Sequence, residues 1–147
     1  MSRGALILAF NNEQTDYLAM ASWSAGRIRH WLDIPVAVVT NDPERAGQLS
    51  KFDKIIATTS ETGGTRWFED YGATVSWHNA GRTDVYNLTP WDETLVLDAD
   101  YVVNSNVLDT AWHAKPDFLC FRSAFDATGS VDSLSETFGR YRFPRSE

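Results

Sequence analysis

The sequence predicts one α/β domain built around a mostly parallel β-sheet, and three observations support this. Apolar runs of strand length alternate along the chain with segments of helical period. The runs are continuously apolar rather than alternating, as expected of strands that are covered on both faces. The chain has 147 residues, of which 43% are hydrophobic, enough for one domain with its own core. No repeat or linker interrupts the pattern.

The first half of the chain predicts three strands and two helices. The apolar run 4–10 ends in two asparagines and is the first expected strand. A long helix follows, with apolar residues at helical spacing from position 17 to 32 and with Asn12 as its expected cap. The next expected elements are a strand at 34–40, a short helix at 44–49 and a strand at 54–57.

The second half is less regular. Residues 58–64 are polar and glycine-containing and are expected to form a loop, whereas the aromatic segment 67–77 has no clear period and receives no assignment. The remaining expected elements are a helix at 79–88, a strand at 94–97, an extended segment at 102–103, a short helix at 106–112 and a strand at 117–122. We therefore expect one domain over residues 1–147.

Composition narrows the functional classes. Thirteen basic and twenty acidic residues give a net charge of −7, which argues against a broad grip on a nucleic-acid backbone. Cys120 is the single cysteine, so no intrachain disulfide is expected and a reducing compartment is favoured. The longest strongly apolar run, 5–10, is too short to span a bilayer. We expect a cytoplasmic protein without a membrane span.

The feature that indicates chemistry is the Asp98-Ala99-Asp100 triplet at the end of the strand 94–97. In extended backbone, positions two apart point to the same side, so the two carboxylates are expected to converge. Converging carboxylates suit Mg²⁺ or Mn²⁺, whose coordination a diphosphate would complete. The same triplet also fits a polar strand end at the surface.

The segment 82–103, RTDVYNLTPWDETLVLDADYVV, resembles the centre of glycosyltransferases of the GT-A fold, especially the glycogenin-like group, glycosyltransferase family 8. The resemblance implies a Rossmann-like three-layer sandwich that binds a nucleotide-diphospho-sugar, expected to be a UDP-sugar. It implies that Asp98 and Asp100 hold Mn²⁺ or Mg²⁺ against the diphosphate, with Ala99 beside the donor. Arg82 takes the place of a basic residue that contacts phosphate or sugar. Its alternative is a solvated arginine paired with Asp84 or Glu93.

Further donor contacts are expected at the ends of the first two strands. In the family the end of the first strand forms a wall for the nucleotide base, and Ala9, Phe10 and Asn11 occupy this place. Tyr17 is a candidate for stacking on the base, or else a core aromatic on the helix. Asp42 is a candidate partner of the ribose or base, or else part of an Asp-Pro turn.

The chain also departs from the family pattern. Family members are generally longer, and their later half supplies the acceptor site and a third metal ligand, usually a histidine. His113 is the only histidine downstream of the triplet, and it falls on an expected helix. We therefore expect a truncated or minimal transferase with an unknown acceptor, or a domain that binds the donor without turnover.

Two other classes stay open. The triplet also matches the first motif of haloacid-dehalogenase-like phosphatases, although that motif belongs on the first strand of its domain. A non-catalytic binding or assembly module would use the six tryptophans, or the tail in which Arg140, Arg142 and Arg145 alternate with Tyr141 and Phe143. A sugar-nucleotide pyrophosphorylase is disfavoured, because no glycine follows the first strand in residues 10–16.

Overall fold

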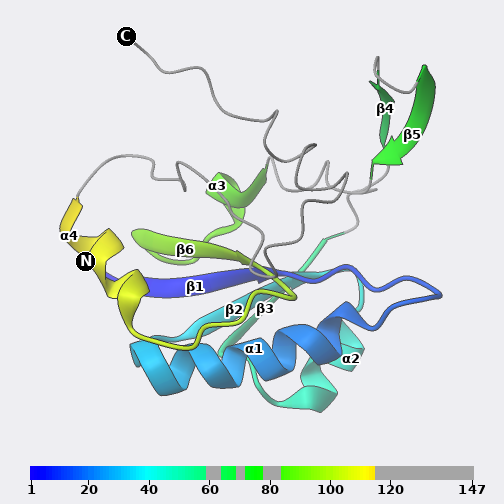
Figure 1. The fold of residues 1–147 in the computed structure, drawn as a ribbon. Helices are drawn as coiled ribbons and strands as arrows, with labels where there is room; N and C mark the ends of the chain where they lie inside the picture. Colours follow the sequence, from blue (N-terminus) through cyan, green and yellow to red (C-terminus); the bar gives the residue numbers. More distant parts are fainter. Residues whose placement is uncertain (59–63, 69–71, 78–83, 115–147) are drawn as a thin grey trace, which may run out of the picture. The chain divides into compact units, whose positions relative to one another are not determined.

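The computed structural model describes residues 1–58, 64–68, 72–77 and 84–114 (Figure 1). The chain divides into two units, Met1–Trp112 and His113–Glu147. The described elements belong to the first unit, apart from the short helix that runs past its end to Ala114. The strand expected at 117–122 and the basic tail lie outside the described residues. The expectation of a single domain stays a prediction.

A four-stranded parallel sheet forms the centre of the first unit, so the expected α/β class is confirmed. Its strands are β1 (Arg3–Leu8), β2 (Val36–Thr40), β3 (Lys54–Ala57) and β6 (Glu93–Asp98), in the order β3-β2-β1-β6. All three neighbouring pairs are parallel. The expected strands 4–10 and 94–97 are therefore adjacent in one parallel sheet, and this order is that of half a doubly wound sheet.

Helices α1 (Tyr17–Leu32) and α2 (Pro43–Leu49) cover one face of this sheet (Figure 1). The buried residues of α1 recur at helical spacing and pack on the alternate strand residues that face them. The contributors are Leu18, Ala21, Ala25, Ile28 and Leu32 from α1, Ala46 from α2, and Ala5, Ile7, Ala9, Val36, Val38 and Leu97 from the strands and their ends. This cluster accounts for most of the buried apolar side chains.

The opposite face of the sheet carries a smaller cluster. Its buried members are Leu6, Leu8, Ala37 and Val39, and Phe10, Ile56, Trp91 and two residues of α3 (Val85–Leu88) pack against it. A glycine is required at position 4, because a Cβ there would overlap the indole of Trp91. Of the helix expected at 79–88, Val85–Leu88 is helical, while 78–83 lie outside the described residues.

The long helix begins later than expected. Asp16, not Asn12, is the N-cap of α1, and its side chain accepts a hydrogen bond from the backbone N–H of Ala19. Asn12 instead closes a local turn, because its Oδ1 accepts from the N–H groups of Gln14 and Thr15, both at 2.9 Å. That turn occupies the residues that an earlier helix start would need.

The segment that received no assignment contains a β-hairpin. Strands β4 (Gly64–Phe68) and β5 (Ala73–Trp77) pair antiparallel as a separate two-stranded sheet. After β6, residues 101–104 belong to no helix or strand, and η3 (Val107–Thr110) with α4 (Ala111–Ala114) replaces the single expected helix. Within the described ranges, no helix is both long enough and apolar enough to cross a membrane.

Candidate functional site

The expected site residues that fall within the described ranges lie at the carboxyl edge of the parallel sheet. The chain adds β2 and β3 on one side of β1 and then returns to place β6 on the other side. In sheets of this kind, ligands bind where the strand order reverses, just beyond the carboxyl ends of the strands. Here that point lies between β1 and β6, where Leu8 is the register partner of Asp98.

The Asp98-Ala99-Asp100 triplet forms a turn rather than extended backbone. Asp98 is the last residue of β6, and its carbonyl accepts a hydrogen bond from the N–H of Tyr101 at 3.0 Å. Alternation along a strand therefore stops at Asp98, and the expected convergence of the two carboxylates by strand alternation is wrong. The turn instead exposes both aspartates at the carboxyl edge and buries Ala99 between them.

Asp98 and Asp100 lie on different sides of the sheet edge. Leu8, the register partner of Asp98, packs in the cluster opposite α1, and partners in a parallel pair face the same side of the sheet. Ala99 packs in the cluster under α1, and Asp100 lines a hollow beside that helix. An ion held by both aspartates would therefore sit at the tip of the turn rather than on one face of the sheet.

The segment after the turn is anchored along α1. The hydroxyl of Ser24, buried in the middle of the helix, donates to the carbonyl of Tyr101. One helical turn later, Nε of Arg27 donates to the carbonyl of Val103 at 3.2 Å. Since Val103 is also buried, the triplet is fixed on both sides, by β6 before it and by α1 after it.

The loop that follows β1 is equally well fixed. Ala9 is buried and continues the ladder by donating its N–H to the carbonyl of Val39 at 3.0 Å. Phe10 packs on the face of the sheet away from α1. Asn11 then pairs with the side chain of Asn41, which accepts from the Asn11 N–H and donates to the Asn11 carbonyl, both at 2.9 Å. The side-chain amide thus extends the β1–β2 ladder beyond both strands.

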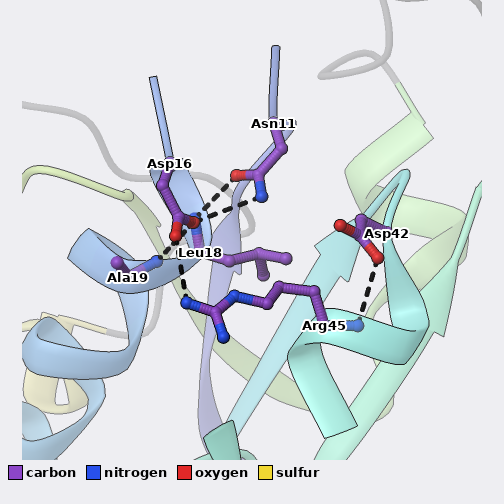
Figure 2. Close-up of polar contacts among 6 residues, drawn as sticks. All are labelled: Asn11, Asp16, Leu18, Ala19, Asp42 and Arg45. Atoms are coloured by element: carbon purple, nitrogen blue, oxygen red, sulfur yellow. Dashed lines mark hydrogen bonds and ion pairs between the residues drawn. The ribbon is translucent and has the colours of Figure 1, made fainter. Parts of the chain in front are cut away.

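Figure 2 shows how this loop is connected to the starts of the two helices. Oδ1 of Asn11 accepts from the N–H of Leu18 at 3.0 Å, while its Nδ2 donates to Asp16 at 3.2 Å. Asp16 also accepts from Nη2 of Arg45, at 3.2 Å, so that a side chain of α2 contacts the cap of α1. The loop between β1 and α1 is therefore fixed by side-chain hydrogen bonds at its start, through Asn11, and at its end, through Asp16.

Hydrogen bonding stabilises the ionised form of Asp16. The backbone N–H of Ala19 contributes most, and the side chains of Arg45 and Asn11 add to it, so that the pKa of Asp16 is lowered from its ordinary value. Asp16, Asn41 and Arg45 were all missed in the sequence. Only the position of Asp16 before a helical pattern offered a signal, since Asn41 and Arg45 act through contacts between distant segments.

Tyr17 and Asp42 both have structural roles at this edge. Tyr17 is half-buried and packs against the core under α1, as in its alternative interpretation. Asp42 is the N-cap of α2, and its carboxylate accepts from the N–H of Arg45 at 3.1 Å, with Pro43 as the first helical residue (Figure 2). Base or ribose contacts by these two residues stay predictions.

A hollow of about 430 Å³ lies beside the triplet, open to solvent and lined by Ala19, Met20, Trp23, Ala99 and Asp100. Met20 and Trp23 were not singled out in the sequence as site residues. A signal existed, because both positions fall on the side of the helical pattern that the apolar core positions leave unoccupied. Among the described residues that line it, Asp100 is the one charged residue.

The other candidate residues are Arg82, with its two alternative partners, and His113. Arg82 lies outside the described residues. Of its two alternative partners, Glu93 is engaged by Arg3 in an ion pair, and Asp84 is exposed. His113 is exposed on α4. In the part of the chain that the structure describes, no group of three or more His, Cys, Asp or Glu side chains is arranged to hold a metal.

The chemistry of the two aspartates nevertheless suits a hard divalent cation. Mg²⁺ is commonly bound through one or two carboxylates, with substrate phosphates and water completing its coordination. Asp98 and Asp100 supply such a pair, both exposed at the edge of the sheet. Comparisons with protein-family models, curated proteins and solved structures found no match.

Proposed function

We propose that the protein binds a nucleotide-diphospho-sugar through a divalent cation held by Asp98 and Asp100, and transfers the sugar to an acceptor. It would be a metal-dependent glycosyltransferase with a Rossmann-like sheet of the GT-A type. The observation that carries the proposal is the position of the Asp98–Tyr101 turn, which ends β6 beside β1 where the strand order reverses.

The two aspartates would act by holding the cation at the diphosphate. A bound Mn²⁺ or Mg²⁺ supplies charge neutralisation for the departing nucleoside diphosphate. The anchoring of the turn by Ser24 and Arg27 supports this role, because both hydrogen bonds restrict the backbone that carries Asp100. Two carboxylates and a diphosphate exceed the charge of one divalent ion, so a further cation is needed, and Arg82 is assigned to it.

The nucleoside would lie against the loop that follows β1. The pairing of Asn11 with Asn41 supports this assignment, since these protein hydrogen bonds hold residues 9–11 beside the start of the turn at Asp98. Such a preformed wall lowers the cost of ordering a loop on binding. Tyr17 and Asp42 lie at the two helix starts that flank the same edge.

A phosphatase of the haloacid-dehalogenase type is the weaker alternative. Its nucleophilic aspartate ends the first strand of the domain, whereas β1 here ends in Leu8 and is followed by Ala9 and Phe10. The Asp-x-Asp strand is the last of the four in chain order. A domain that binds the donor without turnover would share the proposed site and is separated from the transferase by the assay below.

The test is release of UDP from a panel of UDP-sugars by the full chain with Mn²⁺, with and without added saccharide acceptors. We expect Asp98→Asn and Asp100→Asn each to lower the rate of UDP release at least tenfold, about 1.4 kcal/mol of transition-state stabilisation. Asp33→Asn is the control, because Asp33 is an exposed carboxylate at the other end of α1. Equal rates in all three variants would overturn the proposal. Tight UDP binding without turnover would reduce it to a binding module.

A further inference from the structure

The hollow beside Asp100 has a composition that the cation site does not explain. A metal site needs oxygen ligands, but among the described residues Ala19, Met20, Trp23 and Ala99 supply apolar surface beside one acidic residue, Asp100. Trp23 is 58% exposed and Met20 43% exposed, although both lie on the long helix that covers the sheet. An exposed indole beside an acidic residue indicates a ligand that has both apolar and polar surface.

The indole of Trp23 is held in place rather than left free on the surface. The guanidinium of Arg27 lies over its ring at 6.0 Å, and the same guanidinium lies over the ring of Trp31 at 5.7 Å. Arg27 is itself fixed, because its Nε donates to the carbonyl of Val103. A braced aromatic ring costs less entropy to use as a binding surface than a mobile one.

The chemistry of the lining restricts the occupant. A purely apolar ligand would desolvate the Asp100 carboxylate without giving it a partner. A phosphate group would be repelled by that carboxylate, and a cationic ligand would meet the Arg27 guanidinium already over Trp23. A sugar ring suits both the apolar lining and Asp100. One face of a pyranose presents C–H groups to an indole, and its edge presents hydroxyl donors to a carboxylate.

We infer that this hollow binds a saccharide ring, which stacks on the indole of Trp23 and donates a hydroxyl hydrogen bond to Asp100. The inference rests on the proposed function for the role of Asp100, whose two carboxylate oxygens allow one to face a cation and the other a hydroxyl. The ring belongs either to the donor sugar or to a saccharide acceptor. In both cases the ligand is a pyranose ring bound beside Asp98 and Asp100.

The experiment measures saccharide binding to the full chain in two arms. The donor arm compares the dissociation constants of UDP, UDP-glucose, UDP-galactose and UDP-N-acetylglucosamine with Mn²⁺ by calorimetry. The acceptor arm uses saturation-transfer NMR to measure binding of the methyl glycosides of glucose, galactose and N-acetylglucosamine. Tetramethylammonium is measured in the same way as the cationic alternative. The variants are Trp23→Ala, Trp23→Phe and, as a matched control, Trp31→Ala. Trp31 is also an exposed indole of α1 in contact with the Arg27 guanidinium, but it does not line the hollow.

We expect Trp23→Ala to weaken binding of at least one saccharide about tenfold, Trp23→Phe to restore most of it, and Trp31→Ala to leave it unchanged. An effect confined to the UDP-sugars, with UDP itself unaffected, assigns the ring to the donor. An effect on the methyl glycosides assigns it to an acceptor. Binding that is the same in Trp23→Ala and the parent, or Trp23-dependent binding of tetramethylammonium alone, overturns the inference. Loss of UDP binding in Asp98→Asn reports on the proposed function separately, because Asp98 does not line the hollow.

Discussion

Asn11 and Asn41 form a reciprocal pair in which one side-chain amide satisfies both backbone groups of its partner. The Asn11 N–H donates to Oδ1 of Asn41 and the Nδ2 of Asn41 donates to the Asn11 carbonyl, each at 2.9 Å. The pair lies two residues beyond the last backbone rung, from the Ala9 N–H to the Val39 carbonyl. It joins the loops after β1 and β2 and thereby shapes the carboxyl edge of the sheet.

The first prediction concerns this pair. Asn41→Ala removes both hydrogen bonds and is expected to destabilise the fold by about 1–2 kcal/mol in urea unfolding. It should also weaken UDP binding, because the loop that carries Asn11 is no longer held. Asn104→Ala, at an exposed position in the irregular segment after the triplet, is the control and should change neither quantity. Equal stability of Asn41→Ala and the parent would contradict the role of the pair.

A second prediction follows from the cap of α1. Hydrogen bonds from the Ala19 N–H and from Arg45 and Asn11 lower the pKa of Asp16 in the folded state. Its stabilising effect is therefore fully present above the unfolded pKa of about 3.9 and is lost as pH falls through the lower folded pKa. Asp16→Ala should cost about 1 kcal/mol at pH 7, the value typical of a lost N-cap. In urea titrations between pH 7 and pH 3, a constant or growing difference from the parent on acidification would contradict this account.

A third prediction uses two glycines with opposite surroundings. Gly4→Ala places a methyl group where the Trp91 indole lies and should destabilise the protein by about 1–3 kcal/mol. Gly26→Ala meets no atom within 4 Å in the middle of α1 and should stabilise it by up to about 1 kcal/mol. Thermal unfolding measures both. Most of the Gly4→Ala cost should disappear in a Trp91→Ala background, and persistence of the full cost there would rule out the contact as its cause.

A fourth prediction concerns Arg82, the cation assigned to the diphosphate. Arg82→Ala is expected to lower UDP release from the preferred UDP-sugar about tenfold or more, with Arg82→Lys intermediate because it keeps the charge but loses the bidentate geometry. Lys51→Ala, an exposed basic residue before β3, is the control. Unchanged turnover in Arg82→Ala would leave the phosphate contact to another group, and the alternative of a solvated arginine would then stand.

The two central strands, β1 and β2, were predictable because they are buried on both faces and are therefore continuously apolar. The strands expected at 4–10 and 94–97 were confirmed as members of one parallel sheet, with bounds of Arg3–Leu8 and Glu93–Asp98. The hairpin β4–β5 was missed because its aromatic residues have no alternating pattern. The turn at Asp98 was missed for another reason. The segment that follows it is held by Ser24 and Arg27, which are distant in sequence and reach it only in the folded protein.

In the candidate site, too, some residues could be identified from the sequence and others depend on contacts between distant segments. The triplet could be identified from its residue types and its place after an apolar strand. The helix start at Asp16 and the links from Asn41 and Arg45 could not, since each depends on contacts between loops. Trp23 lay within a helix that was correctly expected, but its place beside Asp100 follows from how residues 99–103 run along α1.

The most direct test of the central claim is calorimetric titration of UDP into the full chain, with Mn²⁺ and again after chelation of the metal. The proposal predicts saturable UDP binding that needs the metal and weakens at least tenfold in Asp98→Asn and in Asp100→Asn, but not in Asp33→Asn. UDP binding of equal affinity with and without Mn²⁺, or unchanged by the loss of both aspartates, would contradict a metal bridge between this turn and a diphosphate.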